Sequence, residues 1–215
     1  TPLIRSEVLN VLTTRSDWLM KLVDAIEDKQ VSRADLSAGI RQLMITHSDK
    51  EMRTRAKELL PTSSADRLQV VKAYQPALKL NGDLARGKRV FQSVCIACHK
   101  LDGVGVDLGP NLASVTDRRP GSLLSGILDP NASVESKYGS YLASAKDGRS
   151  VLGILISENG ANITIKDQAN QEHVILRSEL VSLTNTGRSL MPDGLETSLT
   201  QQNLADVIAY VAAAK

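Results

Sequence analysis

The alternation of hydrophobic and polar residues predicts helices over roughly the first third of the chain. Up to about residue 75, apolar side chains recur every three or four positions, which is the spacing of amphipathic helices. Four polar residues stand where helix caps are expected, each before an apolar stripe: Ser16, Ser32, Asp49 and Ser64. We expect Trp18, Leu22 and Ile26 to share the buried face of the first of these helices.

A second helical pattern begins after a proline-containing linker. Asp83 can cap a helix that carries Gly87 and Phe91 on adjacent turns. Near the end of the chain, Thr200 can cap a helix whose apolar residues also recur at helical spacing. A glycine lets another helix approach closely, so the last helix can cross at Gly87 with Tyr210 facing it. The two patterns by themselves favour two ordinary amphipathic helices, and it is the motif between them, described below, that favours the crossing.

The segment from about residue 138 to 184 has the pattern of strands. Asp147-Gly148 and Asn159-Gly160 are strong hairpin signals. Strand-forming residues fill four runs between and after these turns: 151–156, 161–165, 174–176 and 181–183. The pattern predicts a small antiparallel β meander or closed barrel inserted between the helices.

Composition narrows the class of protein. The chain has 215 residues and 42% hydrophobic residues, enough for one large domain or two modest ones. With 26 basic and 24 acidic residues, the charge balance gives no reason to expect nucleic acid or an anionic membrane as a partner. No run of about 18 apolar residues occurs, so no transmembrane helix is expected. The sequence opens at Thr1 without a signal peptide, and we expect a mature form or an excised piece of a longer protein.

Both cysteines of the chain lie in one short motif, Cys95-Ile96-Ala97-Cys98-His99. This C-x-x-C-H arrangement is typical of the attachment of c-type haem. Two thiols three positions apart at the end of a helix can reach the two vinyl groups along one edge of a porphyrin, and the next residue is then held beneath the iron. His99 is therefore the predicted proximal ligand.

Other interpretations of the two cysteines remain open: a redox dithiol, half of a zinc site, or two buried thiols. A zinc site needs a second pair of ligands, but no further cysteine exists, and His47 and His173 lie far from the motif in unlike contexts. A thioredoxin-like dithiol needs a βαβ pattern, whereas the residues before the motif form a helical pattern. Haem attachment is the interpretation that the pattern favours.

Five features in this order resemble a class I cytochrome c: the helix with Gly87 and Phe91, the C-x-x-C-H motif, Gly109-Pro110-x-Leu112, Met191-Pro192 and the closing helix. The resemblance implies that the Pro110 carbonyl accepts the N–H of His99 and that Leu112 packs on the haem ring. It also implies that Met191, in a loop before the last helix, is the distal ligand. The remaining methionines fit core positions on amphipathic helices: Met20, Met44 and Met52.

Three segments further resemble the haem-binding domain of multidomain dehydrogenase-like proteins in planctomycetes and related bacteria: residues 127–132, 147–149 and 189–192. Those domains often follow helical repeats and a β-propeller catalytic domain. The resemblance implies a HEAT-like helical segment and linker at 1–79, where a generic helical bundle fits nearly as well, and a cytochrome c-type haem domain at 80–215. The implied fold is mainly α, a helical-repeat segment followed by a cytochrome c fold that carries the β insertion at about 138–184.

These features lead to an electron-transfer hypothesis. We expect one haem c, bound covalently by Cys95 and Cys98 with His99 and Met191 as axial ligands, in an electron carrier without catalytic residues that can be part of a larger oxidoreductase. The expected partner is a redox protein or a fused dehydrogenase domain. Because bacteria attach haem to C-x-x-C-H motifs outside the cytoplasm, the expected location is periplasmic or otherwise extracytoplasmic.

Two alternatives accompany this hypothesis. The first is a haem enzyme or sensor with a labile sixth site, and the second is a helical interaction module in which haem is structural. The β insertion is expected to be dispensable for haem ligation, because the cytochrome-like features lie on both sides of it. Its two ends must then lie close together.

Overall fold

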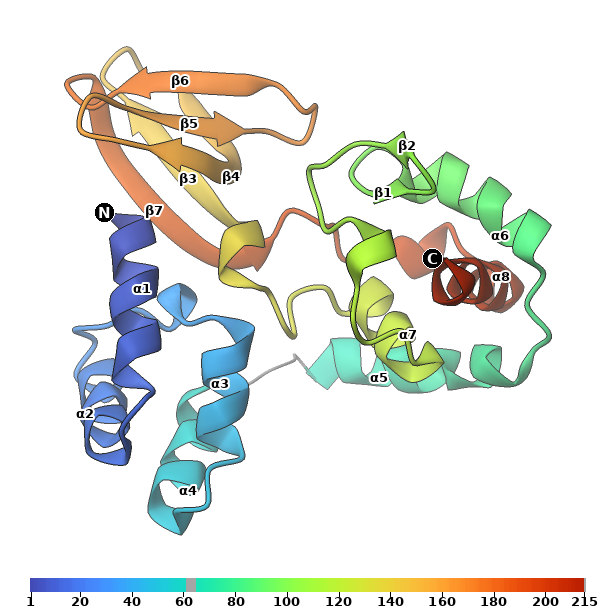
Figure 1. The fold of residues 1–215 in the computed structure, drawn as a ribbon, viewed down its shortest axis with the longest axis horizontal. Helices are drawn as coiled ribbons and strands as arrows, with labels where there is room; N and C mark the ends of the chain where they lie inside the picture. The colour runs from blue at the N-terminus through green and yellow to red at the C-terminus, as the bar shows by residue number, and fades with distance from the viewer. Residues whose placement is uncertain (61–64, 215) are drawn as a thin grey trace. The chain divides into compact units, whose positions relative to one another are not determined.

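The structure is a computed structural model, and it describes residues 1–60 and 65–214 (Figure 1). By contacts, the chain divides into two compact units, each built from separate stretches of sequence. The first unit comprises residues 1–62, 133–165 and 172–189, and the second comprises residues 63–132, 166–171 and 190–215. These units group the chain differently from the predicted domains at 1–79 and 80–215, which remain a proposal about domain organisation.

Four helices of the first unit enclose an aliphatic core: α1 (Pro2–Leu12), α2 (Ser16–Glu27), α3 (Ala38–Ile45) and α4 (Lys50–Leu59). As predicted, Asp49 caps α4 by accepting a hydrogen bond from the Met52 backbone N–H at 2.9 Å. The core consists mainly of aliphatic and methionine side chains from these helices and their connections: Leu9, Leu19, Leu22, Val23, Ile26, Leu36, Ile40, Met44, Met52, Ala56 and Leu60. The helices form as predicted in type, but nothing shows that they are copies of one repeat, so the HEAT-like interpretation stays a prediction.

Two of the predicted helix starts and one core residue are corrected by the structure. The buried stripe of α2 is Leu19, Leu22, Val23 and Ile26, whereas Trp18 is only half-buried and lies 4.9 Å from the Arg15 guanidinium. Ser16 is the first residue of α2 and makes no cap. Ser32 caps only a single 3₁₀ turn, and α3 begins later, capped by Ser37. The predicted cap at Ser64 lies outside the described residues.

The first unit also contains a five-stranded sheet: β3 (Gly139–Ala145), β4 (Ser150–Glu158), β5 (Asn162–Lys166), β6 (Glu172–Leu176) and β7 (Leu180–Ser189). The strand order is β6-β5-β4-β3-β7, with β3 antiparallel to both β4 and β7. The predicted meander describes β3 to β6, which are neighbours in chain order, whereas β7 departs from it by returning to pair with β3. The strand order has β6 and β7 as its two edges, so the alternative of a closed barrel is wrong. Pairing of Gly139 with Ser189 brings the ends of the segment together, as expected.

Both predicted hairpin turns are present and have clear local causes. Gly148 adopts a φ of +87°, a conformation that glycine accepts without steric cost, between β3 and β4. Between β4 and β5, the Asn159 side chain accepts hydrogen bonds from the Ala161 and Asn162 backbone N–H groups at 2.8 and 2.9 Å. The strand content is larger than the description mainly α implies, although helices remain the larger part.

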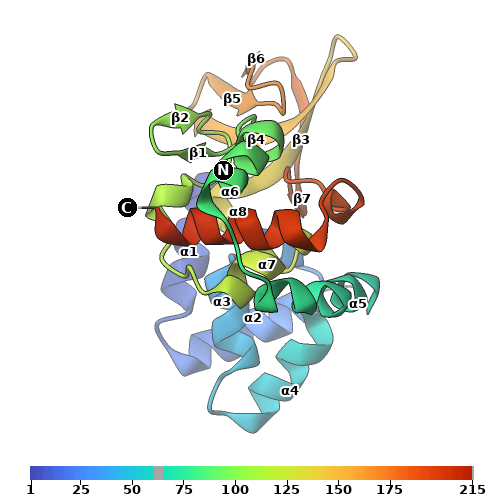
Figure 2. The ribbon, with the colours of Figure 1, turned by 90° about the vertical axis from the view of Figure 1, so that its right-hand side faces the viewer.

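The second unit is built around α8 (Gln201–Ala213), which runs horizontally in Figure 2 with α6 (Leu84–Val90) and α7 (Pro120–Leu128) on either side. α5 (Ala65–Tyr74) and the two-residue strands β1 (Lys100–Leu101) and β2 (Val104–Gly105) complete the regular elements described there.

The predicted crossing of α6 and α8 is confirmed. A Cβ atom at Gly87 would lie 2.1 Å from the Asp206 carbonyl oxygen, so the two helices approach at a distance that only glycine permits. Phe91 packs against Tyr210 with ring centroids 5.9 Å apart and an interplanar angle of 59°. The crossing fixes the position of the chain that leads into Cys95.

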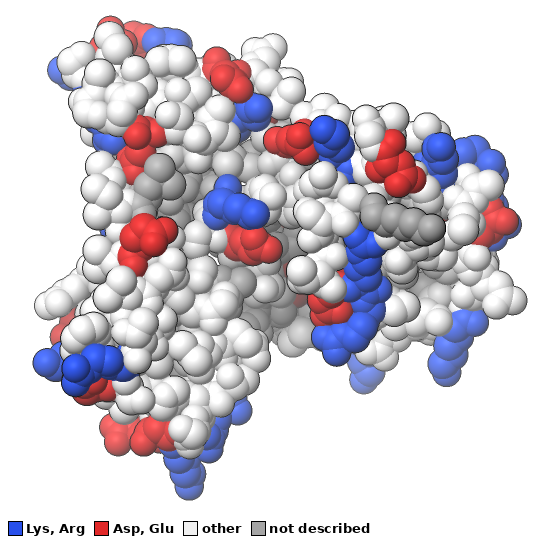
Figure 3. Space-filling model, in the orientation of Figure 1, with Lys and Arg blue, Asp and Glu red and all other residues white. Residues whose placement is uncertain are grey.

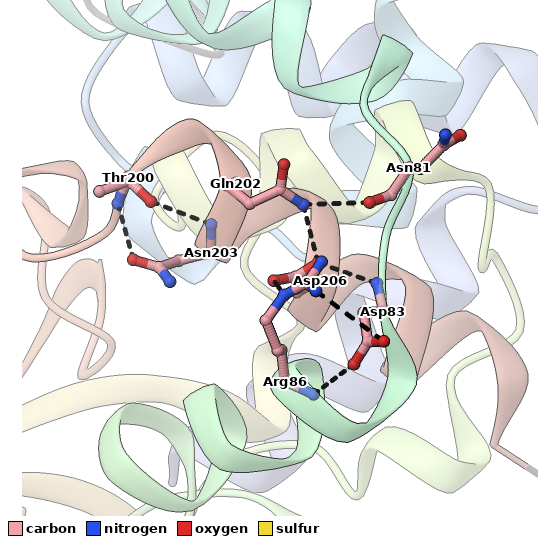
Figure 4. Close-up of polar contacts among 7 residues, drawn as sticks. All are labelled: Asn81, Asp83, Arg86, Thr200, Gln202, Asn203 and Asp206. Carbon is pink, nitrogen blue, oxygen red and sulfur yellow. Dashed lines mark hydrogen bonds and ion pairs between the residues drawn. The ribbon is translucent and has the colours of Figure 1, made fainter.

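A fully buried acid, Asp206, lies at the same crossing and joins the two helices (Figure 4). Its carboxylate accepts hydrogen bonds from Arg86 Nε at 2.6 Å, Arg86 Nη2 at 2.8 Å, the Asp83 backbone N–H at 2.8 Å and Gln202 Nε2 at 2.9 Å. The hydrogen bonds from Arg86 lower the pKa of Asp206 from 3.8 to about 2, although burial opposes this.

Replacement of Asp206 by asparagine is expected to lower the free energy of unfolding by about 2 kcal/mol. The cost stays below that of breaking a fully buried ion pair because the Arg86 side chain is 46% exposed and water can replace its partner. Since the folded-state pKa of Asp206 is depressed, its contribution is complete above pH 3.8 and is lost as the pH falls toward 2.

Denaturant unfolding followed by circular dichroism at pH 7 and pH 2.5 measures this effect. Asp107→Asn is the matched control, because that carboxylate is 64% exposed and has its Lys100 partner at 3.6 Å. The Asp206→Asn variant should differ from the parent strongly at pH 7 and less at pH 2.5. Equal effects of the two substitutions at pH 7 would contradict the assignment.

Candidate functional site

The two cysteines lie on a turn that continues directly from α6. The helix widens into one π-helical turn at Phe91–Cys95, closed by a hydrogen bond of 3.0 Å from the Ile96 N–H to the Phe91 carbonyl. The Cys95 carbonyl then accepts the N–H groups of Cys98 at 3.1 Å and His99 at 2.9 Å. Cys95 and Cys98 are half-buried and are not joined in a disulfide.

The loop after the motif folds back against it. The Cys98 carbonyl accepts hydrogen bonds from the backbone N–H groups of Leu108 at 3.2 Å and Gly109 at 2.7 Å. Gly105, with a φ of +102°, passes so close to the motif that a Cβ atom there would lie 2.1 Å from the His99 carbonyl oxygen. The backbone around the two thiols is therefore fixed from both sides.

The His99 ring is held in one orientation. Its Nδ1 lies 2.8 Å from the Pro110 carbonyl oxygen, the contact that the resemblance implies. A Cβ atom at Gly109 would lie 2.7 Å from His99 Cε1, so the glycine gives the ring its space. Because Nδ1 must donate to a carbonyl, Nε2 carries the free lone pair. Burial lowers the pKa of His99, opposed by the Pro110 hydrogen bond, and favours the neutral ring that binds metal.

An apolar wall stands beside the motif. Cys95 and Leu112 both pack against a buried cluster formed by side chains from the π-helical turn, β1 and α8: Phe91, Leu101, Val207, Tyr210 and Val211. Tyr210 also donates a hydrogen bond of 2.7 Å to Asp102 Oδ2, which ties α8 to the loop after His99. A flat apolar group attached at Cys95 would meet this wall on one side.

Two of the other interpretations of the motif, the redox dithiol and the zinc site, are disfavoured by the surroundings of the thiols. Burial, with a smaller contribution from Cys98, raises the pKa of Cys95 to about 11, and burial also raises the pKa of Cys98. A redox dithiol needs a lowered pKa at its attacking thiol, so this pair is poorly suited to that reaction. Across the described residues, no group of three or more His, Cys, Asp or Glu side chains is arranged to hold a metal ion, and a zinc site has no support.

Met191 lies in the second unit, the unit that contains His99. It is half-buried in the loop between β7 and a 3₁₀ turn at Leu195–Thr197. Its role as a ligand stays a prediction. Met44 and Met52 are fully buried in the core of the first unit, in agreement with their predicted packing role. His173 lies on β6 in the first unit.

Sequence reasoning missed several residues around the Met191 loop. The predicted boundary at residue 79 places Arg67 in the helical segment, whereas the structure places it in the second unit, in contact with Glu196. Asn131 donates to Asp193, and Gln168 donates to the Leu190 carbonyl. Asn131 belongs to one of the segments that carry the family resemblance, and no local sequence pattern marks Arg67 or Gln168.

A model of the Cytochrome c family matches residues 84–148, which includes α6, the C-x-x-C-H motif and Pro110. The chain carries a cytochrome c-like domain. Such a domain indicates haem binding and electron transfer, and members of this family are generally electron carriers. The match ends before Met191 and α8, and a search of curated proteins finds no match to the chain.

Proposed function

We propose that this chain is an electron-transfer domain that binds one haem c through thioethers at Cys95 and Cys98, with His99 and Met191 as axial ligands. The observation that carries the proposal is the orientation of the His99 ring. Its Nδ1 is held by the Pro110 carbonyl, so Nε2 is left for iron. His99 directly follows Cys98, and neither Cys98 nor Cys95 is in a disulfide. When bound, haem c supplies a one-electron couple at its iron.

The residues of the chain fit such a group. Cys95 and Cys98 present two free thiols three positions apart in the sequence, and Gly109 leaves space for the His99 ring. Leu112 packs against the apolar wall, and the two together would exclude water from one side of the site. The role of the chain is then to bind, orient and shield, and we expect no residue to act as acid, base or nucleophile.

The same proposal covers partners and location. A redox protein or a fused dehydrogenase domain would deliver or accept the electron, and attachment of the haem would take place outside the cytoplasm. Acidic and basic side chains are intermixed on the face that Figure 3 draws, in keeping with a net charge of +2. Every helix in the described parts of the chain is too short or too polar to span a membrane.

The proposal predicts a reversible one-electron redox couple and a low-spin spectrum. The oxidised holoprotein should show the weak long-wavelength band of an iron–sulfur bond, and the reduced protein should not bind carbon monoxide. Optical redox titration with mediators measures both properties. A high-spin spectrum with carbon monoxide binding in the unmodified protein would favour the enzyme or sensor with an open sixth site. A haem that does not exchange electrons with mediators would favour a structural haem.

A further inference from the structure

Arg67 of α5 connects three elements of the second unit. Its guanidinium donates two hydrogen bonds to the Glu196 carboxylate, from Nη1 at 2.7 Å and Nη2 at 2.9 Å. It also donates from Nε, at 2.9 Å, and from Nη2 to the carbonyl of Leu128, the last residue of α7. The side chains of Arg67 and Glu196 are only 16% and 14% exposed.

This contact is stronger than an ordinary surface ion pair. A bidentate pair between Arg and a carboxylate combines charge with a fixed geometry, and water has little access to it here. Arg67 also places positive charge at the negative end of the α7 dipole. The hydrogen bonds from Arg67 lower the pKa of Glu196 and raise the pKa of Arg67. Tyr74 of α5 adds a hydrogen bond of 3.1 Å to the Glu196 carbonyl.

Further contacts hold the same loop on both sides of Met191. Before it, Gln168 Nε2 donates to the Leu190 carbonyl at 2.9 Å. After it, Asn131 Nδ2 donates to both carboxylate oxygens of Asp193 at 3.0 and 2.9 Å. Asn131 lies three residues after Leu128, so the chain that holds Asp193 follows directly from the end of α7 that Arg67 binds.

We propose that Arg67 is a positioning residue for the loop that carries Met191, and this inference rests on the proposed ligation of iron by Met191. A thioether is a weak neutral ligand, so its occupancy depends on how much conformational freedom the loop loses when sulfur binds. Arg67 fixes the end of the loop at Glu196 and the end of α7, from which the chain continues to Asn131 and its contact with Asp193, and thereby removes part of that freedom beforehand. α5 then contributes to the proposed haem site, although the sequence pattern predicts it as part of the helical segment before the haem domain.

The contact of Gln168 changes one sequence-based expectation. Residues 166–171, at the end of β5 and in the turn after it, belong to the second unit. Deletion of the β insertion, predicted at about 138–184 and expected to be dispensable for haem ligation, would remove Gln168. The β segment is then expected to contribute to Met191 ligation, with an effect smaller than that of Arg67. Gln168 is exposed and makes one neutral hydrogen bond to this loop.

The test is displacement of the Met191 sulfur by added imidazole in the oxidised holoprotein, followed by loss of the iron–sulfur band. Arg67→Met should lower the imidazole concentration at half-displacement about tenfold, because all four hydrogen bonds of the guanidinium, two to Glu196 and two to the Leu128 carbonyl, are lost. Glu196→Gln keeps the bonds to Leu128 and should give a smaller shift in the same direction. If Arg67→Met fails to fold, Glu196→Gln provides the test on its own.

Arg86→Met is the matched control, because it breaks an Arg–carboxylate pair in the same unit at the α6–α8 crossing. It should lower the denaturant midpoint without moving the imidazole midpoint. The inference is overturned if Arg67→Met and Glu196→Gln leave the imidazole midpoint unchanged, or if Arg86→Met moves it as far. Absence of the iron–sulfur band in the unmodified protein would instead contradict the proposal that Met191 binds the iron.

Discussion

Replacement of both Cys95 and Cys98 by alanine is expected to abolish covalent attachment of haem completely. These are the only cysteines of the chain, so no other thiol can form a thioether. The backbone around them is held by hydrogen bonds to the Cys95 and Cys98 carbonyls, which the substitutions leave in place. The double variant should therefore fold and lose the group, whereas each single variant should keep one thioether.

Acid-acetone treatment measures the result directly, because it extracts haem that is held only by coordination. The unmodified protein should retain its haem, the double variant should retain none, and the single variants should show the altered reduced pyridine spectrum of one remaining vinyl group. Ser93→Ala is a suitable control, since Ser93 is exposed in the same turn and its hydroxyl only donates to the Val90 carbonyl. Clean extraction of haem from the unmodified protein would contradict thioether attachment.

The features that were predicted well from the sequence depend on interactions between residues that are close together in the chain. The hairpin at Gly148 follows from the φ value that glycine tolerates, and the start of α4 follows from the capping hydrogen bond of Asp49. The crossing at Gly87 involves a distant helix, but the motif beside it places it in a known order of features. In each case the decisive residues are adjacent in sequence or belong to one recurrent pattern.

The features that sequence missed depend on partners far away in the chain. Asp206 reads as a polar residue on an amphipathic helix, and its burial becomes understandable only when Arg86, 120 residues earlier, supplies the countercharge. Arg67 likewise finds Glu196 at a separation of 129 residues. β7 pairs with β3, across two intervening hairpins, and alternation of residues carries no information about which edge a strand joins.

The position of Trp18 shows a different kind of error. A stripe of residues every four positions and a stripe shifted by one position fit almost equally well in a short helix. The structure selects Leu19, Leu22, Val23 and Ile26 as the buried set, because these side chains meet the rest of the aliphatic core. Tertiary packing, which the local pattern does not contain, decided between the two faces.

Substitution of Met191 is expected to change the coordination and the reduction potential of the iron more than any other single replacement in the loop between β7 and the 3₁₀ turn. Met191→Ala should remove the sulfur and open a coordination position, so that the reduced protein binds carbon monoxide and the oxidised protein binds cyanide. Met191→His should restore six-coordinate low-spin iron but lower the reduction potential, because a thioether stabilises reduced iron relative to an imidazole. Absorption spectra and mediated redox titration measure both outcomes.

Met44→Leu and Met52→Leu provide matched controls, because both side chains are fully buried in the first unit and leucine has a similar volume. They should cost less than about 1.5 kcal/mol of stability and leave the spectrum and potential unchanged. An unchanged spectrum and potential in Met191→Ala would mean that the distal ligand lies elsewhere. His173 would then be the first residue to replace, and the proposal of an electron carrier with His and Met ligands would have to be withdrawn.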